Sequence, residues 1–544
     1  MRRRRIYLTT AIPYVNADPH LGFALELVQA DSLARQRRLR GDEVRLLTGT
    51  DDHSLKNVLA AEAAGVATAE LVKRNAARFA DLQRSLQLTF DDFIRTSTDP
   101  RHQPAVDRLW RACEAAGDLY RDVYEGLYCV GCEQFYEPDE LVAGLCPEHE
   151  TAPERVAEEN WFFRLSRYGD RLADLITSGR LRILPEFHAL DVLRFIRGGL
   201  RDFSVSRSRE RARGWGVPVP GDPTQVIYVW WDALGNYISA LDYGTYGQAY
   251  RRWWLEADER VHVIGKGILR FHAVYWPAML LSAGEPPPTS ILVHEYLTAN
   301  GRRLSKSLGN TVDPAATAER FGPDAVRWWL LREVQPAADT DFRSERLVAC
   351  ADADLAHALG NLVNRTVTMV HGYRTGRVPA GGAGPLADLL GRLPAEVDAA
   401  LESFDFRTAV GVVMDAVDAA NRLVNRTRPW ELARAGRSAE LDSVLAALVD
   451  ACRTVARELS PFVPGLAHRI AHQLGDGGVE LRQAEPVFPR LGPAHGGELH
   501  GPQQARAATA MPGKAQSSSG SPSKTGPEGS RLAPSPARGS ASTA

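Results

Sequence analysis

The first fifty residues alternate between strand and helix patterns, and this restricts the fold more than any other feature. A β-rich run spans Ile6–Ile12, and apolar side chains then recur at helical spacing over Leu21–Val28. A second β-rich run follows at Glu43–Thr48. This order predicts a parallel α/β unit, because parallel strands need a long crossover that is usually a helix. Such units bind ligands at the carboxyl ends of their strands, where His20–Phe23 and Thr50–His53 would lie.

The α/β pattern stops after about 115 residues and returns later in the chain. Strands are expected again at Gln225–Trp230 and at Val261–Ile264. From about residue 324 the apolar spacing is helical, with no convincing alternating strands until about residue 478, which favours a helix bundle. Residues 500–544 contain no Phe, Trp or Tyr. This tail is expected to be disordered, because it cannot bury enough apolar surface to offset the entropy of ordering.

Together these patterns predict a multidomain α/β protein. The expected parts are a split nucleotide-binding domain (residues 1–115 and 225–323), an insertion (116–224), an all-helical domain (324–485) and a tail (492–544).

Composition and charge favour a globular protein that stays in the cytoplasm. Hydrophobic residues make up 44% and charged residues 24%, and no apolar run approaches the roughly 20 residues that a membrane span requires. Arg2–Arg5 resemble a signal-peptide start, but Pro13, Asn16 and Asp18 precede any long apolar segment. The net charge of −2 gives no overall attraction to nucleic acid, so any RNA contact would need a local surface.

Two short cysteine-containing pairs have the spacing of a zinc site. They are Cys129-Val-Gly-Cys132 and Cys146-Pro-Glu-His149. Two tight pairs joined by a loop can each hold one side of a tetrahedral Zn²⁺, with thiolates and an imidazole as ligands. The alternative is a set of free or redox-active thiols. The other three cysteines lack such neighbours and are expected to be ordinary buried thiols: Cys113, Cys350 and Cys452.

Two further motifs carry a family resemblance. Pro19-His20-Leu21-Gly22-Phe23 and Arg303-Leu304-Ser305-Lys306-Ser307-Leu308-Gly309-Asn310 resemble the two signature motifs of class I aminoacyl-tRNA synthetases. Between them lie Glu125–Cys129, Asn160–Phe163, Ser204–Arg207, Tyr228–Ala233 and Phe271–Pro277. In order and spacing, the whole set resembles the methionyl-tRNA synthetase family from about residue 6 to residue 480.

The resemblance implies an enzyme that adenylates L-methionine with ATP and transfers it to the 3′ end of tRNA(Met). It also implies that the split domain is Rossmann-like, that the insertion carries a zinc knuckle and that the helical domain binds the anticodon. Activation redistributes negative charge as pyrophosphate leaves, so the site needs positioned donors and cations, with Mg²⁺ accompanying ATP. The implied catalytic residues are His20, Lys306 and Arg303, and the implied ATP-binding residues are His20, Gly22, Ser305, Lys306 and Ser307.

A methionine pocket needs an apolar and aromatic wall that selects an unbranched thioether by shape and sulfur contacts. The family motifs imply that Asp51 pairs with the substrate ammonium. They imply that the remaining pocket residues are Ala11, Ile12, Tyr14, Trp230, Ala233, Leu234, Tyr237, Ile268 and His272. Each aromatic taken alone is more often a core residue than a pocket residue.

The helical region contains residue types that suit RNA recognition. Asn361 and Arg365 lie one helical turn apart, opposite an apolar face, and Pro429 precedes Trp430 at an expected helix start. Unpaired bases stack on indoles and hydrogen-bond to Asn and Arg. The resemblance implies that Asn361, Arg365 and Trp430 read the anticodon. The alternative is an ordinary bundle helix with a solvated polar face and Trp430 in the core.

Three positions depart from the family pattern. Phe23 stands where a histidine is usual, Arg303 where a lysine is usual, and Gly267 where an aspartate that would pair with Arg207 is expected. The change at position 303 keeps the charge, whereas the other two remove a hydrogen-bond donor and a carboxylate. These two changes put the efficiency of activation and the fine shape of the pocket in question.

Two alternative functions therefore stay open at this point. One is a same-fold adenylating enzyme for another amino acid, and the other is a weakened tRNA-binding paralogue. Retention of His20, Arg303, Ser305 and Lys306 argues against a pure binder, which needs none of them. No second tRNA-binding or dimerisation module is visible after the bundle, so a monomer is expected.

Overall fold

The computed structural model describes residues 3–130, 134–136, 138–147, 150–304 and 310–492. Among these, six strands form a central sheet in the order β3-β2-β1-β12-β13-β7, and every neighbouring pair is parallel. The strands are β1 (Arg5–Thr10), β2 (Glu43–Thr50), β3 (Asp92–Arg95), β7 (Arg182–Leu184), β12 (Glu259–Gly265) and β13 (Ser290–His294). The order reverses between β1 and β12, which is where an open α/β sheet has its ligand crevice.

Both faces of the sheet are covered, as a parallel sheet requires. Alternate residues of β1 belong to different cores: Ile6 and Leu8 pack with α1 (Leu21–Leu39) and α12 (Pro323–Arg332), whereas Tyr7 packs with helices on the other face. That second face is covered by α5 (His102–Ala115), α8 (Val229–Ser239) and α10 (Trp276–Ser282). The first strand, the first helix and the second strand confirm the predicted parallel unit.

The insertion is only partly as expected. It contains an antiparallel sheet of β4 (Leu119–Cys129), β5 (Gln134–Tyr136), β6 (Glu154–Phe163) and β8 (Phe203–Ser204). However, β7 also falls in the range 116–224, and it pairs with β13 at the edge of the parallel sheet. The chain therefore returns to the parallel sheet once within the expected insertion.

The prediction that Gln225–Trp230 forms a strand of the parallel sheet was wrong. β11 (Asp222–Ile227) pairs antiparallel with β9 (Ser206–Ser208) and with β10 (Pro218–Val219), outside the parallel sheet. Helix α8 then begins at Val229, so Trp230 is helical. An apolar run of this length suits either a strand or a buried helix, and tertiary packing decides between them.

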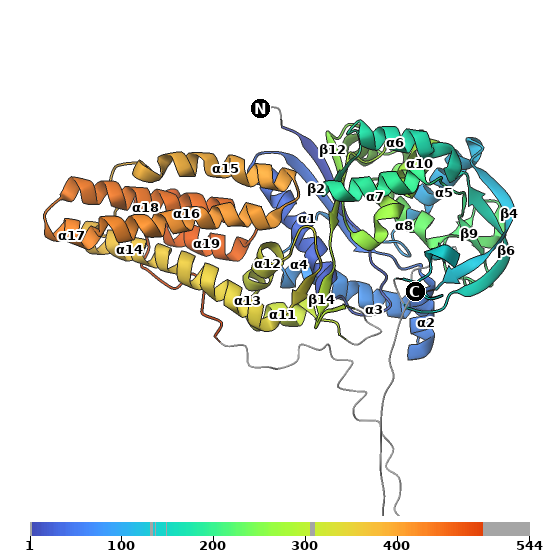
Figure 1. Cartoon of the computed structure of the whole chain (residues 1–544), viewed down its shortest axis with the longest axis horizontal. Helices are drawn as coiled ribbons and strands as arrows, with labels where there is room; N and C mark the ends of the chain where they lie inside the picture. The colour runs from blue at the N-terminus through green and yellow to red at the C-terminus, as the bar shows by residue number, and fades with distance from the viewer. Residues whose placement is uncertain (1–2, 131–133, 137, 148–149, 305–309, 493–544) are drawn as a thin grey trace, which may run out of the picture. The chain divides into compact units, whose positions relative to one another are not determined.

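The C-terminal part of the described chain is a helix bundle, as predicted. It comprises α13 (Ser344–Ala351), α14 (Asn361–Arg374), α15 (Ala387–Glu402), α16 (Phe406–Thr427), α17 (Pro429–Arg434), α18 (Ser438–Leu459) and α19 (Pro464–Gln473) (Figure 1). One short strand, β16 (Thr340–Phe342), lies within the region expected to be helical and pairs with β14 (Leu297–Ala299). Among the described residues, no helix has the length and apolar character needed to cross a membrane.

The remaining helices flank these parts. They are α2 (Leu55–Ala64), α3 (Thr68–Ala80), α4 (Leu82–Ser85), α6 (Gly169–Thr177), α7 (Glu186–Arg197), α9 (Gln248–Tyr250) and α11 (Pro314–Phe321). The predicted tail from residue 493 onward lies outside the described residues.

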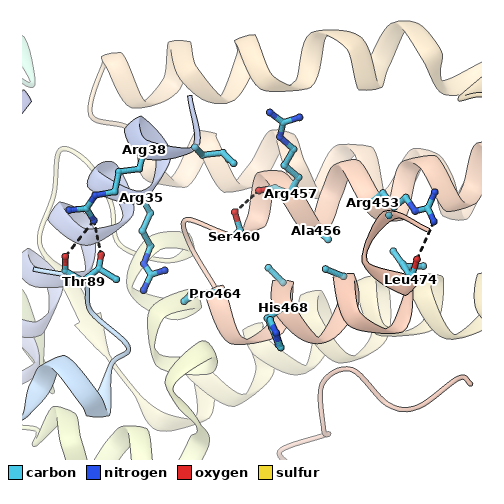
Figure 2. Close-up of a pocket in the computed structure, with 14 residues that line it drawn as sticks. Arg35, Arg38, Thr89, Arg453, Ala456, Arg457, Ser460, Pro464, His468 and Leu474 are labelled. Atoms are coloured by element: carbon cyan, nitrogen blue, oxygen red, sulfur yellow. Dashed lines mark hydrogen bonds between the residues drawn. The ribbon is translucent and has the colours of Figure 1, made fainter. Parts of the chain in front are cut away.

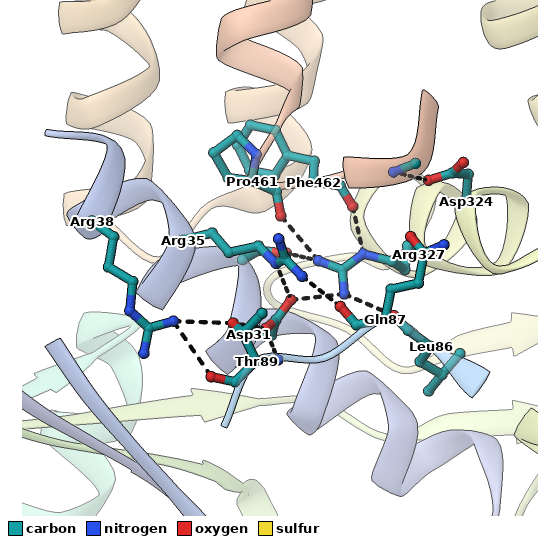
Figure 3. Close-up of polar contacts among 12 residues, drawn as sticks. Asp31, Arg35, Arg38, Leu86, Gln87, Thr89, Asp324, Arg327, Pro461 and Phe462 are labelled. Atoms are coloured by element: carbon teal, nitrogen blue, oxygen red, sulfur yellow. Dashed lines mark hydrogen bonds and ion pairs between the residues drawn. The ribbon is translucent and has the colours of Figure 1, made fainter. Parts of the chain in front are cut away.

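A buried arginine joins the α/β part to the bundle (Figure 3). Arg327 on α12 is fully buried and forms an ion pair of 2.8 Å with Asp31 on α1, which is also fully buried. Its guanidinium donates to the carbonyl oxygens of Phe462 (2.7 Å), Pro461 (2.9 Å) and Leu86 (3.1 Å). One side chain thus ties α1 to the turn between α18 and α19, and apolar residues of both parts form one continuous core.

Candidate active site

A cavity of about 340 Å³ opens at the reversal point of the sheet. It is lined by segments that follow β1, β2 and β12, together with the start of α1, the start of α8 and the chain after β13. The predicted ligand residues that line it are His20, Gly22, Ala11, Ile12, Tyr14, Asp51, Trp230 and Ile268. Residues scattered over more than 250 positions of sequence therefore meet in one cavity, at the place that the strand order favours.

His20 caps the amino terminus of α1 and offers one defined donor to the cavity. Its Nδ1 accepts a hydrogen bond of 3.1 Å from the backbone N–H of Gly22. A neutral imidazole that accepts at Nδ1 carries its hydrogen on Nε2, so Nε2 is the donor nitrogen of the ring. A Cβ atom on Gly22 would lie 3.0 Å from the His20 ring, which explains the glycine. A helix amino terminus and an imidazole N–H together suit an anion such as phosphate.

Asp51 provides a buried carboxylate at the end of β2. It is 1% exposed, and its Oδ1 accepts a hydrogen bond of 3.0 Å from the backbone N–H of His53. Asp51 also forms a parallel bridge with Tyr14, which holds the segment after β1 beside the segment after β2. The Nζ atom of Lys56 lies 5.6 Å from the centre of the Tyr14 ring. A carboxylate in this position can bind a substrate ammonium.

Aromatic rings form one wall of the cavity. Trp230 stacks on Phe271 with a centroid separation of 3.8 Å and an interplanar angle of 7°, and Tyr14 approaches Trp230 edge-on at 6.4 Å. The predicted pocket residues Ala233, Leu234, Tyr237 and His272 are also buried, but in this structure they do not line the cavity.

Tyr237 and His272 form a buried hydrogen bond, and the contacts of His272 fix its tautomer. The Nδ1 of His272 lies 2.9 Å from the carbonyl oxygen of Ile268, which can only accept, so Nδ1 carries the hydrogen. Its Nε2 therefore accepts from the Tyr237 hydroxyl at 2.6 Å. Burial lowers the pKa of His272 to about 4, which keeps the ring neutral near pH 7. This buried pair thus carries no net charge near pH 7.

Sequence reasoning missed a buried polar pair that lines the cavity. Glu26 on α1 accepts from the backbone N–H of Ala11 at 2.7 Å, and its Oε2 lies 3.2 Å from the Nε2 of His294. The Nδ1 of His294 donates to the carbonyl oxygen of Glu295 at 2.9 Å, so the contact between Nε2 and Glu26 shares a second proton. Burial raises the pKa of Glu26, which favours holding that proton within the pair. The sequence signal that could have identified Glu26 was a carboxylate among the apolar residues of the first helix.

Two of the three departures from the family pattern face this cavity. Phe23 and Gly267 line it, and the Phe23 ring packs edge-on against Phe79 at 5.1 Å. Arg207, which the family pattern would pair with a carboxylate at position 267, donates to the Ser204 hydroxyl at 3.0 Å. Its guanidinium carbon lies 4.4 Å from the centre of the Tyr228 ring.

The second motif is only partly described. Ser305, Lys306 and Ser307 lie outside the described residues, as does the side chain of Arg303, whose backbone belongs to β15 (Arg302–Arg303). Leu304 is buried and lines the cavity, so the chain reaches the cavity wall immediately before Ser305.

The predicted zinc ligands are also only partly described. Cys129 and Cys146 are 2% and 1% exposed and belong to one small buried cluster with Tyr136. The Sγ of Cys146 donates to the Tyr136 hydroxyl at 3.4 Å, and the Sγ of Cys129 lies 3.9 Å from the Oγ1 of Thr151. Cys132 and His149 lie outside the described residues. One cysteine from each predicted pair thus reaches the same cluster.

The predicted anticodon residues lie on the bundle, with their polar groups as expected. Asn361 is exposed and Arg365 half-buried on α14, while Leu362 and Val363 of the same helix are fully buried. Trp430 follows Pro429 at the start of α17 and packs, partly buried, against the bundle core. The indole therefore contacts the core and stays partly accessible to solvent.

A larger cavity lies elsewhere (Figure 2). It measures about 770 Å³ and lies between α1, α18 and α19, with an arginine-rich rim that includes Arg38 and Arg453. Arg38 donates to the Oγ1 of Thr89 at 3.0 Å, and Arg453 donates to the carbonyl oxygen of Leu474 at 3.1 Å. None of the predicted site residues lines it, so chemistry and not volume identifies the active site.

Comparison with known proteins agrees with this arrangement. The family model described as tRNA synthetases class I (M) matches residues 6–156 and 148–367. A methionine–tRNA ligase from Nostoc sp. is 40% identical over 511 residues, which cover 91% of this chain and 94% of that protein. One from Synechocystis sp. is 41% identical over 483 residues, covering 86% and 89%. The solved Mycobacterium tuberculosis methionyl-tRNA synthetase in complex with methionyl-adenylate has a TM-score of 0.83 and 39% identity, covering 90% of this chain and 100% of that one.

The parallel sheet, the cavity at its reversal point and the matching family model define a class I aminoacyl-tRNA synthetase. Within that class, the identity to relatives over almost their whole length is decisive. The chain belongs to the methionyl-tRNA synthetase family.

Proposed function

We propose that this chain activates L-methionine with ATP and then transfers the methionyl group to the 3′ end of tRNA(Met). The observation that carries the proposal is the convergence of His20, Asp51 and the Trp230 wall on one cavity at the sheet reversal. Recognition of an aminoacyl adenylate requires three elements: a hydrogen-bond donor to the phosphate, a carboxylate that pairs with the ammonium group, and an apolar wall for the side chain.

In the activation step, a carboxylate oxygen of methionine attacks the α-phosphorus of ATP, and pyrophosphate leaves. The Nε2–H of His20 donates to a phosphate oxygen beside the amino terminus of α1. Lys306 supplies the main cation, with Arg303 assisting, and the residues on either side, Ser305 and Ser307, bind the phosphates. Mg²⁺ accompanies ATP and neutralises phosphate charge.

Asp51 and the aromatic wall would fix the amino acid. The buried carboxylate binds the substrate ammonium, which orients the methionine carboxylate toward ATP. Trp230 and Tyr14 offer ring faces and edges to the thioether, and the neutral pair of Tyr237 and His272 adds no charge that would favour a polar side chain. Ala11, Ile12, Ala233, Leu234 and Ile268 complete the apolar surface.

The peripheral sites complete the proposal. Cys129, Cys132, Cys146 and His149 would hold one structural Zn²⁺, because they supply a closed tetrahedral set of suitable ligands. The two that the structure describes share one buried cluster, which fits this role. On the bundle, Asn361, Arg365 and Trp430 would read the anticodon by hydrogen bonding and stacking. The enzyme would act as a monomer in the cytoplasm.

Pyrophosphate exchange tests the proposal directly. The purified chain should catalyse ATP–pyrophosphate exchange with methionine in preference to the other amino acids, and should then aminoacylate tRNA carrying a CAU anticodon. Exchange driven by a different amino acid would favour the same-fold adenylating enzyme. Binding of tRNA without any exchange would favour the weakened paralogue.

A further inference from the structure

A buried carboxylate joins two parts of the cavity wall through histidines on both sides. Asp232 is fully buried in the first turn of α8. Its Oδ2 lies 2.6 Å from the Nδ1 of His53, which follows β2, and its Oδ1 accepts a hydrogen bond from the Nε2 of His102 at the start of α5. Asp232 lies within the Tyr228–Ala233 motif, but the activation chemistry described above assigns no role to Asp232, His53 or His102.

The spacing of the cluster fits hydrogen bonds and not a metal ion. Two ligand atoms on one tetrahedral zinc lie about 3.3 Å apart when each bond is about 2.0 Å. The His53 and Asp232 atoms are closer than that, at 2.6 Å. Burial alone would raise the pKa of Asp232, but the neighbouring His53 and His102 outweigh it and lower the pKa below its usual range. An ionised carboxylate only accepts, so both histidines donate to it.

The cluster connects the two groups that would hold methionine. The backbone N–H of His53 donates to the Asp51 carboxylate at 3.0 Å, so the His53 position governs the orientation of the ammonium partner. At its other end, Asp232 lies two residues from Trp230, whose ring lines the cavity. A shift between the loop after β2 and the start of α8 would therefore change the spacing between the ammonium site and the aromatic wall.

We infer that Asp232 is a positioning residue for methionine, which locks the ammonium partner Asp51 and the Trp230 wall at one spacing through His53 and His102. The inference rests on the proposed function, because it assigns a support to the same amino-acid site. Asp232 itself does not line the cavity and touches no reacting atom. Its loss should raise the KM for methionine and leave the KM for ATP nearly unchanged, because the phosphate site is built on α1.

The charge state of His53 gives a readout that simple packing would not. Burial works against protonation of His53, but Asp232 outweighs it and raises the pKa of this histidine. The charged or titratable groups near His53 include Asp232, His102 (ring centroids 6.4 Å apart), Asp51, whose carboxylate accepts from the His53 backbone N–H, and Asp52, which is itself paired with Arg95 at 2.8 Å. Protonated His53 would place positive charge beside the substrate ammonium. For methionine, kcat/KM should thus fall as the pH drops through the pKa of His53.

Steady-state pyrophosphate exchange on four proteins tests the inference. Asp232→Asn removes the charge and presents an N–H to one histidine donor, so the KM for methionine should rise about tenfold, equivalent to a loss of about 1.4 kcal/mol. The acid inflection of kcat/KM should also move to lower pH. His53→Asn keeps a donor at the Nδ1 position but cannot be protonated. It should keep the KM within about threefold of wild type and lose the inflection.

Asp118→Asn is the matched control. Asp118 is another buried carboxylate, 3% exposed, which accepts from Ser282 at 2.8 Å and from Arg167 at 2.8 Å, away from the cavity. Its substitution should lower the melting temperature without changing the methionine KM or the pH profile. If Asp232→Asn only lowered the melting temperature as this control does, Asp232 would be a purely structural residue.

The remaining outcomes are also decisive. If Asp232→Asn does not fold, the inference is overturned when His53→Asn keeps the wild-type inflection, because no other group is assigned to it. Absence of methionine-dependent exchange in the wild-type protein would instead contradict the proposed function, so the two failures are distinguishable.

Discussion

Replacing Arg327 by leucine should destabilise the junction between the α/β part and the bundle far more than loss of a nearby surface arginine. Arg327 is fully buried, and its guanidinium is the donor for three backbone carbonyl oxygens, those of Leu86, Pro461 and Phe462 (Figure 3). The carboxylate of Asp31 would lose one partner in this variant but would not be left without hydrogen bonds. It keeps hydrogen bonds from Arg35 at 2.8 Å and from the backbone N–H and hydroxyl of Thr89, at 2.7 and 2.6 Å.

The magnitude follows from these contacts. Each buried carbonyl that loses its donor costs about 1 kcal/mol or more, so three of them give about 3 kcal/mol. This agrees with the roughly 3–5 kcal/mol expected when one partner of a buried ion pair is removed. For a folding unit of 150–250 residues, each kcal/mol shifts the melting temperature by about 2–4 °C, so Arg327→Leu should lower it by about 10 °C.

Scanning calorimetry on the full chain measures this effect, and Arg469→Leu provides the control. Arg469 lies at the same junction and pairs with Asp324 at 3.0 Å, but its side chain is 45% exposed. Because solvent screens its guanidinium, and because Asp324 keeps a hydrogen bond of 3.1 Å from the backbone N–H of Gly465, its loss should cost about 1 kcal/mol or less. Hydrogen exchange in the turn between α18 and α19 should accelerate only in Arg327→Leu. Equal melting temperatures for the two variants would refute the assignment of Arg327 as the link between the parts.

Three shorter predictions concern other sites. Metal analysis should find one zinc per chain, and Cys132→Ala combined with Cys146→Ala should release it; full metal retention would reject the ligand set. Lys306→Ala should abolish pyrophosphate exchange, whereas Trp430→Ala should spare exchange and impair tRNA charging, and normal charging would remove Trp430 from the anticodon site. Burial would raise the pKa of Glu295, but hydrogen bonds from His188 and Lys266 outweigh it and lower this pKa from 4.5 to about 2. Its stabilisation is therefore present above pH 4.5 and lost as the pH falls toward 2, so acid unfolding followed by circular dichroism should be less steep there in Glu295→Gln.

Local signals explain which parts of the fold could be predicted. β1, α1 and β2 were found because each has its own periodicity, and because α1 begins directly after a capping residue, His20. β7 gave no such signal, since three residues carry no period and their pairing partner, β13, lies about a hundred positions away. The run at Gln225–Trp230 was misassigned because an apolar segment of that length leaves strand and helix undecided.

The site could be predicted as far as motifs reach. Asp51 and Trp230 were found because they occupy recognisable positions, and the structure brings both to one cavity. Glu26 and His294 were missed because their role is a contact between residues far apart in sequence, which leaves only a polar residue among apolar neighbours. The same reason hid Asp232, whose partners come from two other elements.

Phe23→His should raise the rate of methionine-dependent pyrophosphate exchange, but by less than a full catalytic contact. A histidine at this position could donate to phosphate, and a well-placed donor of that kind is worth about 10²-fold or more. The Phe23 ring, however, packs against an apolar cluster of Val15, Val72, Ala76 and Phe79. A more polar imidazole at this position would lose part of that packing.

This environment sets the expected outcome for Phe23→His. Exchange should rise by about tenfold at most, with little change in methionine KM, and thermal stability should fall by about 1 kcal/mol because half-buried packing is lost. Gly267 also limits the gain in exchange rate. It lines the same cavity and offers no carboxylate there to hydrogen-bond with polar neighbours. Exchange kinetics on the wild type and the variant decide the question. An unchanged or lower turnover would mean that Phe23 is a packing residue to which the cavity has adapted. The reaction would then not need a hydrogen-bond donor at position 23.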